Sequence, residues 1–325
     1  MEKPMFACAI LDDFQDVARS VADWGALSGA VTLRAFNEHL GDREAVARAL
    51  AGFEIVVAMR ERTPFDAGLF DRLPKLKLLV TTGMRNASID LEAAAKLGVT
   101  VCGTAGSVGT TAELAWGLIL AVARHIPQEH ALFRAGGKWQ ATVGHGMLGK
   151  TLGVIGLGNL GARVARVGLA FEMKVLAWSR SLTKERCAEV GVAHAGSLDD
   201  LLRAADVVSL HVTLNPQSRG LLGARELALM KPSAYLVNTS RGPIVDEQAL
   251  IAALRERRIA GAGLDVFDRE PLPSDHPLRR LDNIVATPHL GYVTLEGYRV
   301  YYGQAVEDIQ AWIAGNPVRV LRPGK

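Results

Sequence analysis

The chain has 325 residues, 49% of them hydrophobic, and at roughly 150 residues per domain this length indicates two globular domains. Its 37 basic and 34 acidic side chains leave a net charge of +3, which excludes a nucleic-acid-binding protein that depends on a large positive charge. The longest nearly uncharged apolar run, residues 114–123, is too short to span a membrane, and the first residues carry no secretory pattern, so we expect a soluble, cytoplasmic protein.

Short runs rich in Val, Ile and Leu alternate with segments of helical period along most of the chain. Runs that are apolar on both faces are typical of parallel strands covered by helices on both sides. The first set of predicted strands comprises residues 6–11, 54–58, 76–80 and 100–102. The second set comprises residues 152–155, 174–178, 206–211, 234–238, 262–266 and 283–286. The fold class is therefore predicted to be α/β, with two doubly wound parallel sheets.

An apolar helix is predicted between the two sets, over residues 111–123, with Glu113 in its first turn. The polar, glycine-rich residues 125–150 are interpreted as a projecting loop or arm. A last helix, residues 295–314, follows the second set and ends before a Gly-Asn-Pro stop signal. We expect it to return to the first domain. The predicted boundaries are residues 1–104 with 293–325 for the first domain and 105–292 for the inserted one.

A glycine motif follows the first strand of the second set, reading Gly156-Leu157-Gly158-Asn159-Leu160-Gly161. The strand before it, the helix after it and a further strand about twenty residues on form the context of a dinucleotide-binding site. The glycines permit a tight turn, close approach to a pyrophosphate and close packing of helix on sheet. The alternative is a purely structural joint between strand and helix.

The next strand ends in Trp178-Ser179-Arg180, where NAD-selective sites place an acid that binds the ribose hydroxyls. A hydroxyl and a guanidinium at this point suit a ribose 2′-phosphate instead. Arg180 is alternatively a solvated loop cation. We therefore expect NAD or NADP as the cofactor, with NADP slightly favoured.

Three later segments place Arg241, Glu270 and His289 after predicted strands, at the sheet edge where open α/β sheets bind ligands. Transfer of a hydride between nicotinamide and a 2-hydroxy acid needs a cation for the substrate carboxylate and a group that exchanges the hydroxyl proton. Arg241 fits the first role and His289 the second. A carboxylate such as Glu270 beside the imidazole stabilises its protonated form.

The glycine motif and the blocks 238–242, 265–267 with 270–271, and 287–291 resemble the D-isomer-specific 2-hydroxyacid dehydrogenases over nearly the whole chain. The resemblance implies a Rossmann cofactor domain inserted into a flavodoxin-like substrate domain. It implies Arg241 as substrate anchor, Glu270 as partner of His289, and His289 as acid/base. It also implies that Asp265 contacts the nicotinamide end of the cofactor. The expected cofactor residues are Gly156, Gly158, Asn159, Leu160, Gly161, Ser179, Arg180, Thr213, Thr239, Asp265 and Gly291.

The predicted substrate loop, residues 82–90, is bulkier and more basic than is usual in this family. We expect Arg60, Gly83, Met84 and Arg85 to bind substrate, with backbone N–H groups of residues 83–85 holding a carboxylate. The guanidinium groups, with that of Arg62, are also candidates for a second anionic group. The alternative is that they pair with the nearby acids Glu61, Asp66 and Asp90.

The leading hypothesis is an oxidoreductase that interconverts a small 2-keto acid and the D-2-hydroxy acid with NAD or NADP. Family members usually form homodimers through the region matching residues 111–139, so a homodimer is expected. The alternative is a dinucleotide-binding redox sensor or corepressor of the same fold, and a formate-type enzyme is disfavoured by Glu270. Three separated cysteines without metal-ligand spacing predict free thiols and no metal. No nucleic-acid or membrane partner is expected.

Overall fold

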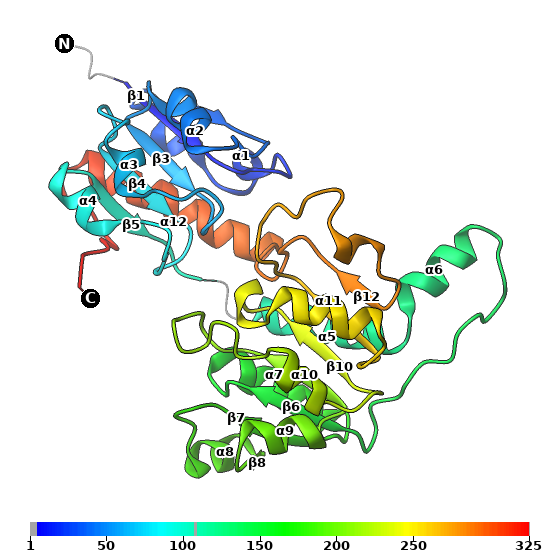
Figure 1. Ribbon diagram of the computed structural model, residues 1–325. Coiled ribbons are helices and arrows are strands. Elements are labelled where there is room, and N and C mark those ends of the chain that lie inside the picture. Colours follow the sequence, from blue (N-terminus) through cyan, green and yellow to red (C-terminus); the bar gives the residue numbers. More distant parts are fainter. Residues whose placement is uncertain (1–4, 107–108, 325) are drawn as a thin grey trace. The chain divides into compact units, whose positions relative to one another are not determined.

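The computed structural model describes residues 5–106 and 109–324. Its strands form two sheets, one of five strands and one of seven, and the paired strands within each sheet are parallel. The chain divides into two units, Met1–Ser107 with Thr294–Lys325 (unit 1) and Val108–Val293 (unit 2). Each unit holds one of the sheets (Figure 1).

Unit 1 contains the first five strands and the last helix of the chain. Its strands are β1 (Phe6–Ile10), β2 (Val31–Ala35), β3 (Ile55–Ala58), β4 (Leu78–Thr81) and β5 (Thr100–Gly103). Its helices are α1 (Ala18–Val21), α2 (Arg43–Leu50), α3 (Ala67–Phe70), α4 (Leu91–Lys96), α12 (Leu295–Ile313) and the 3-10 turn η1 (Trp24–Leu27). Helix α12 packs against β4, α1 and η1, so the end of the chain completes the unit in which the chain begins.

Unit 2 contains the longer sheet and the glycine motif. Its strands are β6 (Thr151–Ile155), β7 (Lys174–Trp178), β8 (Ala193–His194), β9 (Val207–Leu210), β10 (Tyr235–Asn238), β11 (Gly261–Leu264) and β12 (Ile284–Ala286). Its helices are α5 (Thr110–Ala123), α6 (Ile126–Arg134), α7 (Asn159–Ala170), α8 (Lys184–Val190), α9 (Leu198–Ala204), α10 (Ala224–Leu229) and α11 (Glu247–Arg255). The 3-10 turns are η2 (Gly242–Ile244) and η3 (Pro277–Arg280).

The strand order assigns each sheet to a known topology. The order β2-β1-β3-β4-β5 in unit 1 is the flavodoxin-like one, and β12-β11-β10-β9-β6-β7-β8 in unit 2 is the Rossmann order with one added strand. The predicted fold class is confirmed. In unit 2 the direction of winding reverses between β6 and β9, and ligands bind outside the carboxyl ends of the strands at such a point.

The continuous apolar runs reflect strands buried on both faces. In β6, Leu152 and Val154 pack in one hydrophobic cluster, while Ile155 packs in another on the opposite face. In β10, Val237 and Leu236 divide between the same two clusters. Each strand therefore presents apolar side chains to both layers of helices, and this burial stabilises the sheet by about 25 cal/mol per Å² of apolar surface.

Two strands were not predicted, nor was a helix within the segment interpreted as a loop or arm. Strand β2 lies at the edge of its sheet with Thr32 and Arg34 directed away from the core, so its sequence lacks the apolar run of a central strand. Strand β8 has two residues. Helix α6 lies within the segment predicted as a loop or arm and has no buried residue, so no apolar stripe marks it. It extends away from the sheet of unit 2 (Figure 1).

Candidate active site

The glycine motif forms the turn between β6 and α7, and its glycines differ in their surroundings. Gly156 has φ +97°, and a Cβ there would lie 2.6 Å from the carbonyl oxygen of His211. A Cβ at Gly161 would lie 1.9 Å from the carbonyl oxygen of Gly156. A Cβ at Gly158 would meet nothing within 4 Å. The first and third glycines are thus required by the turn and the packing, and the middle one leaves the approach open for a ligand.

A cavity of about 430 Å³ lies at this turn, between the carboxyl ends of β6, β7 and β9. Among its lining residues are the predicted Gly156, Gly158, Ser179, Arg180 and Thr213. It is also lined by residues that sequence reasoning missed: Ser181, Thr183, Arg186, His211, Asn215 and Ser218. Within the described part of the chain, no Asp or Glu lines this cavity, so its charge is positive.

His211 contributes a neutral ring to this cavity. Burial lowers the pKa of His211 to about 4, and its Nε2 lies 2.8 Å from the hydroxyl oxygen of Ser209. The histidine follows β9 directly, at the strand end where the sheet changes direction. Its position after a strand is the signal that could have identified it.

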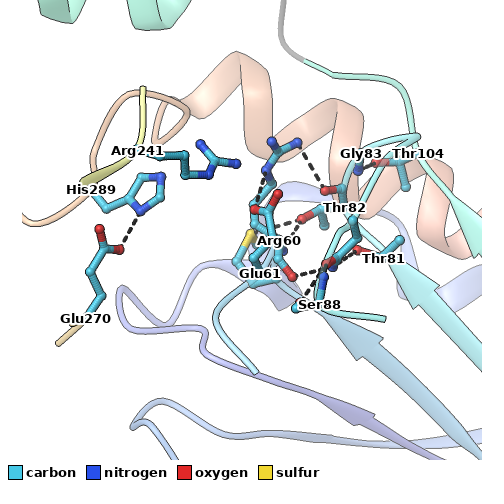
Figure 2. A network of polar contacts seen from close by, with 12 residues as sticks. Arg60, Glu61, Thr81, Thr82, Gly83, Ser88, Thr104, Arg241, Glu270 and His289 are labelled. Atoms are coloured by element: carbon cyan, nitrogen blue, oxygen red, sulfur yellow. Dashed lines mark hydrogen bonds and ion pairs between the residues drawn. The ribbon is translucent and has the colours of Figure 1, made fainter. Parts of the chain in front are cut away.

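His289 and Glu270 form a hydrogen-bonded pair, as Figure 2 shows. Nδ1 of His289 lies 2.6 Å from Oε2 of Glu270, and Oε1 of Glu270 accepts a hydrogen bond of 2.9 Å from the N–H of Phe267. The ring of Tyr292 lies edge-on to the imidazole at 5.6 Å. These contacts fix the orientation of the imidazole, and Nδ1 is the nitrogen engaged by the carboxylate.

Asp265 holds the loop that carries His289. Its side chain is fully buried, and Oδ1 accepts hydrogen bonds from the hydroxyl of Thr287 at 2.6 Å and the N–H of Leu290 at 2.7 Å. Oδ2 accepts one from the N–H of Gly291 at 2.8 Å. The backbone of His289 between these anchors has φ +56°, in the left-handed region that few non-glycine residues adopt. The carboxylate thus stabilises an uncommon backbone conformation at the histidine.

Gly291 also belongs to this support. Its carbonyl oxygen accepts hydrogen bonds of 2.9 Å from the hydroxyls of Thr110 and Thr111, in the first turn of α5. A Cβ at Gly291 would lie 3.1 Å from Oδ2 of Asp265. The expected cofactor contacts of Asp265 and Gly291 stay a prediction, and the structure shows their polar groups bound to neighbouring protein groups. The surrounding Thr110 and Thr111 were not predicted.

Arg241 follows β10 and caps the 3-10 turn η2. Its Nη1 donates to the carbonyl oxygen of Ser240 at 2.7 Å, and its own carbonyl accepts from Nδ2 of Asn238 at 2.9 Å. A Cβ at Gly242 would lie 2.1 Å from the carbonyl carbon of Phe267, so this turn fits closely against the segment leading to Glu270. Thr239, which directly follows β10, has a buried hydroxyl without a hydrogen-bond partner among the described residues.

The predicted substrate loop of unit 1 follows β4. The N–H of Gly83 donates to the hydroxyl of Thr104 at 3.0 Å, so it is not free to hold a carboxylate as expected. Arg60 lies over this glycine: a Cβ at Gly83 would meet its Nη1 at 2.4 Å, and Nη1 donates to the carbonyl of Thr82 (Figure 2). Met84 and Arg85 are exposed. Without the N–H of Gly83, the backbone N–H groups of Met84 and Arg85 are the candidate donors to a substrate carboxylate.

Pairing with nearby acids, the alternative to substrate binding by the unit 1 arginines, occurs for Arg60. Nε of Arg60 lies 3.7 Å from a carboxylate oxygen of Glu61, which is the predicted pairing with a nearby acid. Arg62 donates to the carbonyl of Asp12 and lies 4.5 Å over the ring of Phe14. These guanidinium groups are thus positioned by unit 1 itself.

The comparisons with known proteins agree with this geometry. The family model "D-isomer specific 2-hydroxyacid dehydrogenase, NAD binding domain" matches residues 116–291. A glyoxylate reductase of Aeropyrum pernix is 41% identical over 80% of this chain and 82% of its own length. The chain belongs to the D-isomer specific 2-hydroxyacid dehydrogenase family. A D-3-phosphoglycerate dehydrogenase of Methanocaldococcus jannaschii is 38% identical over 80% of this chain and 50% of its own length.

Among solved structures, a phosphoglycerate oxidoreductase of Vibrio cholerae O395 is similar to the chain described here, with a TM-score of 0.91. The two chains are 37% identical, and the match covers 96% of this chain and 100% of the other. The family assignment supports oxidoreductase activity on hydroxy or keto acids with a nicotinamide dinucleotide. The open approach at Gly158, the acid-free cavity and the unpartnered hydroxyl of Thr239 fit such a cofactor.

The remaining features concern the cysteines, groups of metal-ligating side chains and helix hydrophobicity in the described residues. Cys8, Cys102 and Cys187 are free and buried. Over residues 5–106 and 109–324, no group of histidine, cysteine and acidic side chains is arranged to hold a metal ion. None of the described helices has the length and apolar character needed to cross a membrane.

Proposed function

We propose that this enzyme transfers a hydride between NAD(P)H and C2 of a small 2-keto acid, interconverting it with the D-2-hydroxy acid. The observation that carries the proposal is the His289–Glu270 pair, at 2.6 Å, in the same unit as the glycine motif. A sensor needs the dinucleotide cavity alone, whereas an imidazole oriented by a carboxylate serves proton transfer. The names of the relatives, glyoxylate reductase and D-3-phosphoglycerate dehydrogenase, support the substrate class.

In this proposal His289 exchanges the proton of the substrate oxygen. Because Nδ1 is held by Glu270, Nε2 is the nitrogen that donates to the oxygen at C2 in reduction and accepts the proton in oxidation. The carboxylate stabilises the protonated ring between these steps. When bound, the nicotinamide supplies or receives the hydride.

Arg241 is proposed to hold the substrate carboxylate, because its planar guanidinium offers two parallel N–H donors. We assign the substrate role to unit 1 and the cofactor role to unit 2. In unit 1, Arg60 and the N–H groups of Met84 and Arg85 are the proposed substrate contacts. Gly83 shapes this loop without donating to substrate, since Thr104 takes its N–H.

For the cofactor, we propose contacts from Gly156, Gly158, Asn159, Leu160 and Gly161 at the pyrophosphate, since these residues form the turn and the first residues of α7. Thr213 lines the cavity, and the buried hydroxyl of Thr239 needs a partner that a bound cofactor would provide. Asp265 and Gly291 are proposed as positioning residues for His289 in place of their expected cofactor contacts. Ser179 and Arg180 line the acid-free cavity and favour NADPH over NADH.

The enzyme is proposed to be a homodimer. Helix α6 has no buried residue, and the arm that includes it exposes Phe133, Trp139 and Val143. Exposed apolar groups of this size on one projecting segment indicate a surface that another protein covers. A second copy of the chain is the proposed partner.

The test follows oxidation of NADH and NADPH at 340 nm with glyoxylate, hydroxypyruvate, pyruvate, phosphohydroxypyruvate and longer 2-keto acids. We expect turnover of at least one of them, with a D-hydroxy acid as the product on chiral chromatography. Arg241→Lys should raise KM for the keto acid strongly, because an ammonium lacks the planar fork. Binding of the dinucleotide without turnover of any 2-keto acid would favour the sensor and contradict the enzyme.

A further inference from the structure

The cavity beside the glycine motif contains more cationic and hydroxyl groups than an unphosphorylated ribose needs. Two guanidinium groups line it, from Arg180 and Arg186, and its hydroxyl-bearing residues include Ser179, Ser181 and Thr183. Within the described part of the chain no carboxylate is among the lining residues, and burial keeps His211 neutral. A site of this composition attracts an additional dianion.

Of the two arginines, Arg186 is the one held in place. Its Nε donates to the carbonyl oxygen of Leu157, within the glycine motif, at 3.3 Å. Its Nη1 donates to Glu189 at 2.8 Å, and its backbone N–H donates to the hydroxyl of Thr183 at 3.2 Å. The guanidinium is therefore fixed between α8 and the turn that receives the dinucleotide, at little further cost in side-chain entropy on binding.

Arg180 differs in this respect. It is exposed in the turn after β7, and its side chain forms no hydrogen bond or ion pair with residues 5–106 or 109–324. An exposed, mobile cation loses more entropy in forming an ion pair, and solvent screens the charge. A preorganised guanidinium discriminates between ligands more strongly than an unrestrained one.

We propose that Arg186, with the hydroxyls of Ser181 and Thr183, is the principal determinant for the ribose 2′-phosphate, so that the enzyme prefers NADPH. The inference rests on the proposed function, since it requires that the cavity hold the adenosine half of a nicotinamide dinucleotide. Arg180 is then secondary, although its place in the sequence is the more conspicuous. Glu189 restrains Arg186 but competes with the phosphate for its charge.

The test measures the dissociation constants of 2′,5′-ADP and 5′-ADP by calorimetry on the full chain, which separates phosphate recognition from catalysis. Arg186→Gln should weaken 2′,5′-ADP by about 10- to 100-fold and 5′-ADP by less than about threefold. Arg180→Gln should weaken 2′,5′-ADP by about threefold or less. Arg203→Gln, on α9 and outside the cavity, is the matched control and should change neither value.

A second variant keeps the contact between Arg186 and the glycine motif. Glu189→Gln removes the competing charge, so 2′,5′-ADP should bind more tightly and 5′-ADP unchanged. Equal weakening of both ligands in Arg186→Gln, together with no gain in Glu189→Gln, would overturn the assignment. So would loss of discrimination in Arg180→Gln alone, or equal binding of both ligands by the wild type. Failure of the wild type to bind either ligand would overturn the proposed cofactor site as well.

Discussion

Nδ1 of His289 and Oε2 of Glu270 lie 2.6 Å apart, although the two residues come from different loops of unit 2. The second oxygen of Glu270 is anchored by the N–H of Phe267, so the carboxylate is itself oriented before it orients the imidazole. Because Glu270 engages Nδ1, Nε2 is the nitrogen of His289 that is proposed to exchange the substrate proton. The first prediction tests the pair directly.

His289→Asn should lower kcat by about 100- to 10,000-fold, because the general acid/base is lost. The affinity for NADPH, measured by nucleotide fluorescence, should change by less than about threefold, since His289 acts on the substrate proton. Glu270→Gln should lower kcat less than His289→Asn does, because the imidazole remains but loses the carboxylate that orients it. Turnover that survives in His289→Asn would remove the histidine from the mechanism.

Asp265→Asn is predicted to reduce kcat without loss of cofactor binding. The amide retains one oxygen, but its NH2 group faces N–H donors of the loop, so the support of the backbone at His289 is weakened. The free energy of unfolding should also fall by about 1–3 kcal/mol, the cost of an unsatisfied buried donor. Steady-state kinetics, cofactor titration and urea unfolding together check this. A large rise in the cofactor Kd with unchanged kcat would instead indicate direct contact with the nicotinamide.

Asp308 makes stability depend on pH. This carboxyl of α12 is fully buried, one oxygen accepts from Nε of Arg319 at 2.9 Å, and the other has no partner among the described residues. Burial raises the pKa of the Asp308 carboxyl well above its usual range, to about 7. The folded state therefore binds this proton more tightly than the unfolded state does. Its contribution to stability is full below about pH 4 and is lost as pH rises towards 7.

Asp308→Asn should therefore be more stable than the wild type at about pH 8, by on the order of 2 kcal/mol, and nearly equal to it at about pH 4. Urea midpoints at both pH values measure the difference. His211, whose lowered pKa has the opposite effect on the pH dependence, is present in both proteins and cancels in the comparison. Asp275→Asn, in an exposed loop, is the control. Parallel pH curves for wild type and Asp308→Asn would contradict the prediction.

The arm is predicted to mediate dimerisation. The rings of Phe133 and Trp139 lie 6.3 Å apart, with 68% and 76% of their surfaces exposed in the single chain. Glu129 fastens the returning segment by accepting two hydrogen bonds of 2.6 Å from Thr142. Trp139→Glu should shift the protein from dimer to monomer in sedimentation equilibrium, because a charge is buried at the contact. Lys138→Glu is the control, because it changes the charge next to Trp139 without removing apolar surface. A monomeric wild type would refute the prediction.

Sequence reasoning succeeded where the local pattern and the tertiary environment agree. Central strands such as β9 are buried on both faces, so their composition alone identifies them. It failed for β2, where an edge position allows Arg34 to point outward, and for α6, which packs no face on the body of unit 2.

In the candidate site, too, local sequence motifs indicate some residues, whereas others depend on tertiary contacts. The pairing of His289 with Glu270, which the structure contains, could be predicted because each residue follows a strand within a recognisable motif. The role of Asp265 depends on hydrogen bonds to a loop more than twenty residues later, which no spacing rule reveals. Arg186 was not predicted because it lies on α8, beyond the end of β7 where cofactor-binding side chains are expected, and the extension of the cavity to α8 is a tertiary feature.

The assignment of α12 to unit 1 has a consequence for the order in which the protein folds during synthesis. All strands of unit 2 leave the ribosome before α12, because residues 110–286 precede residues 295–313 in the chain. The sheet of unit 1 is made before unit 2, but the helix that packs against β4 is made after it. Unit 2 can therefore fold while the apolar surface beside β4 is still uncovered, and a nascent chain needs protection there until α12 has been made.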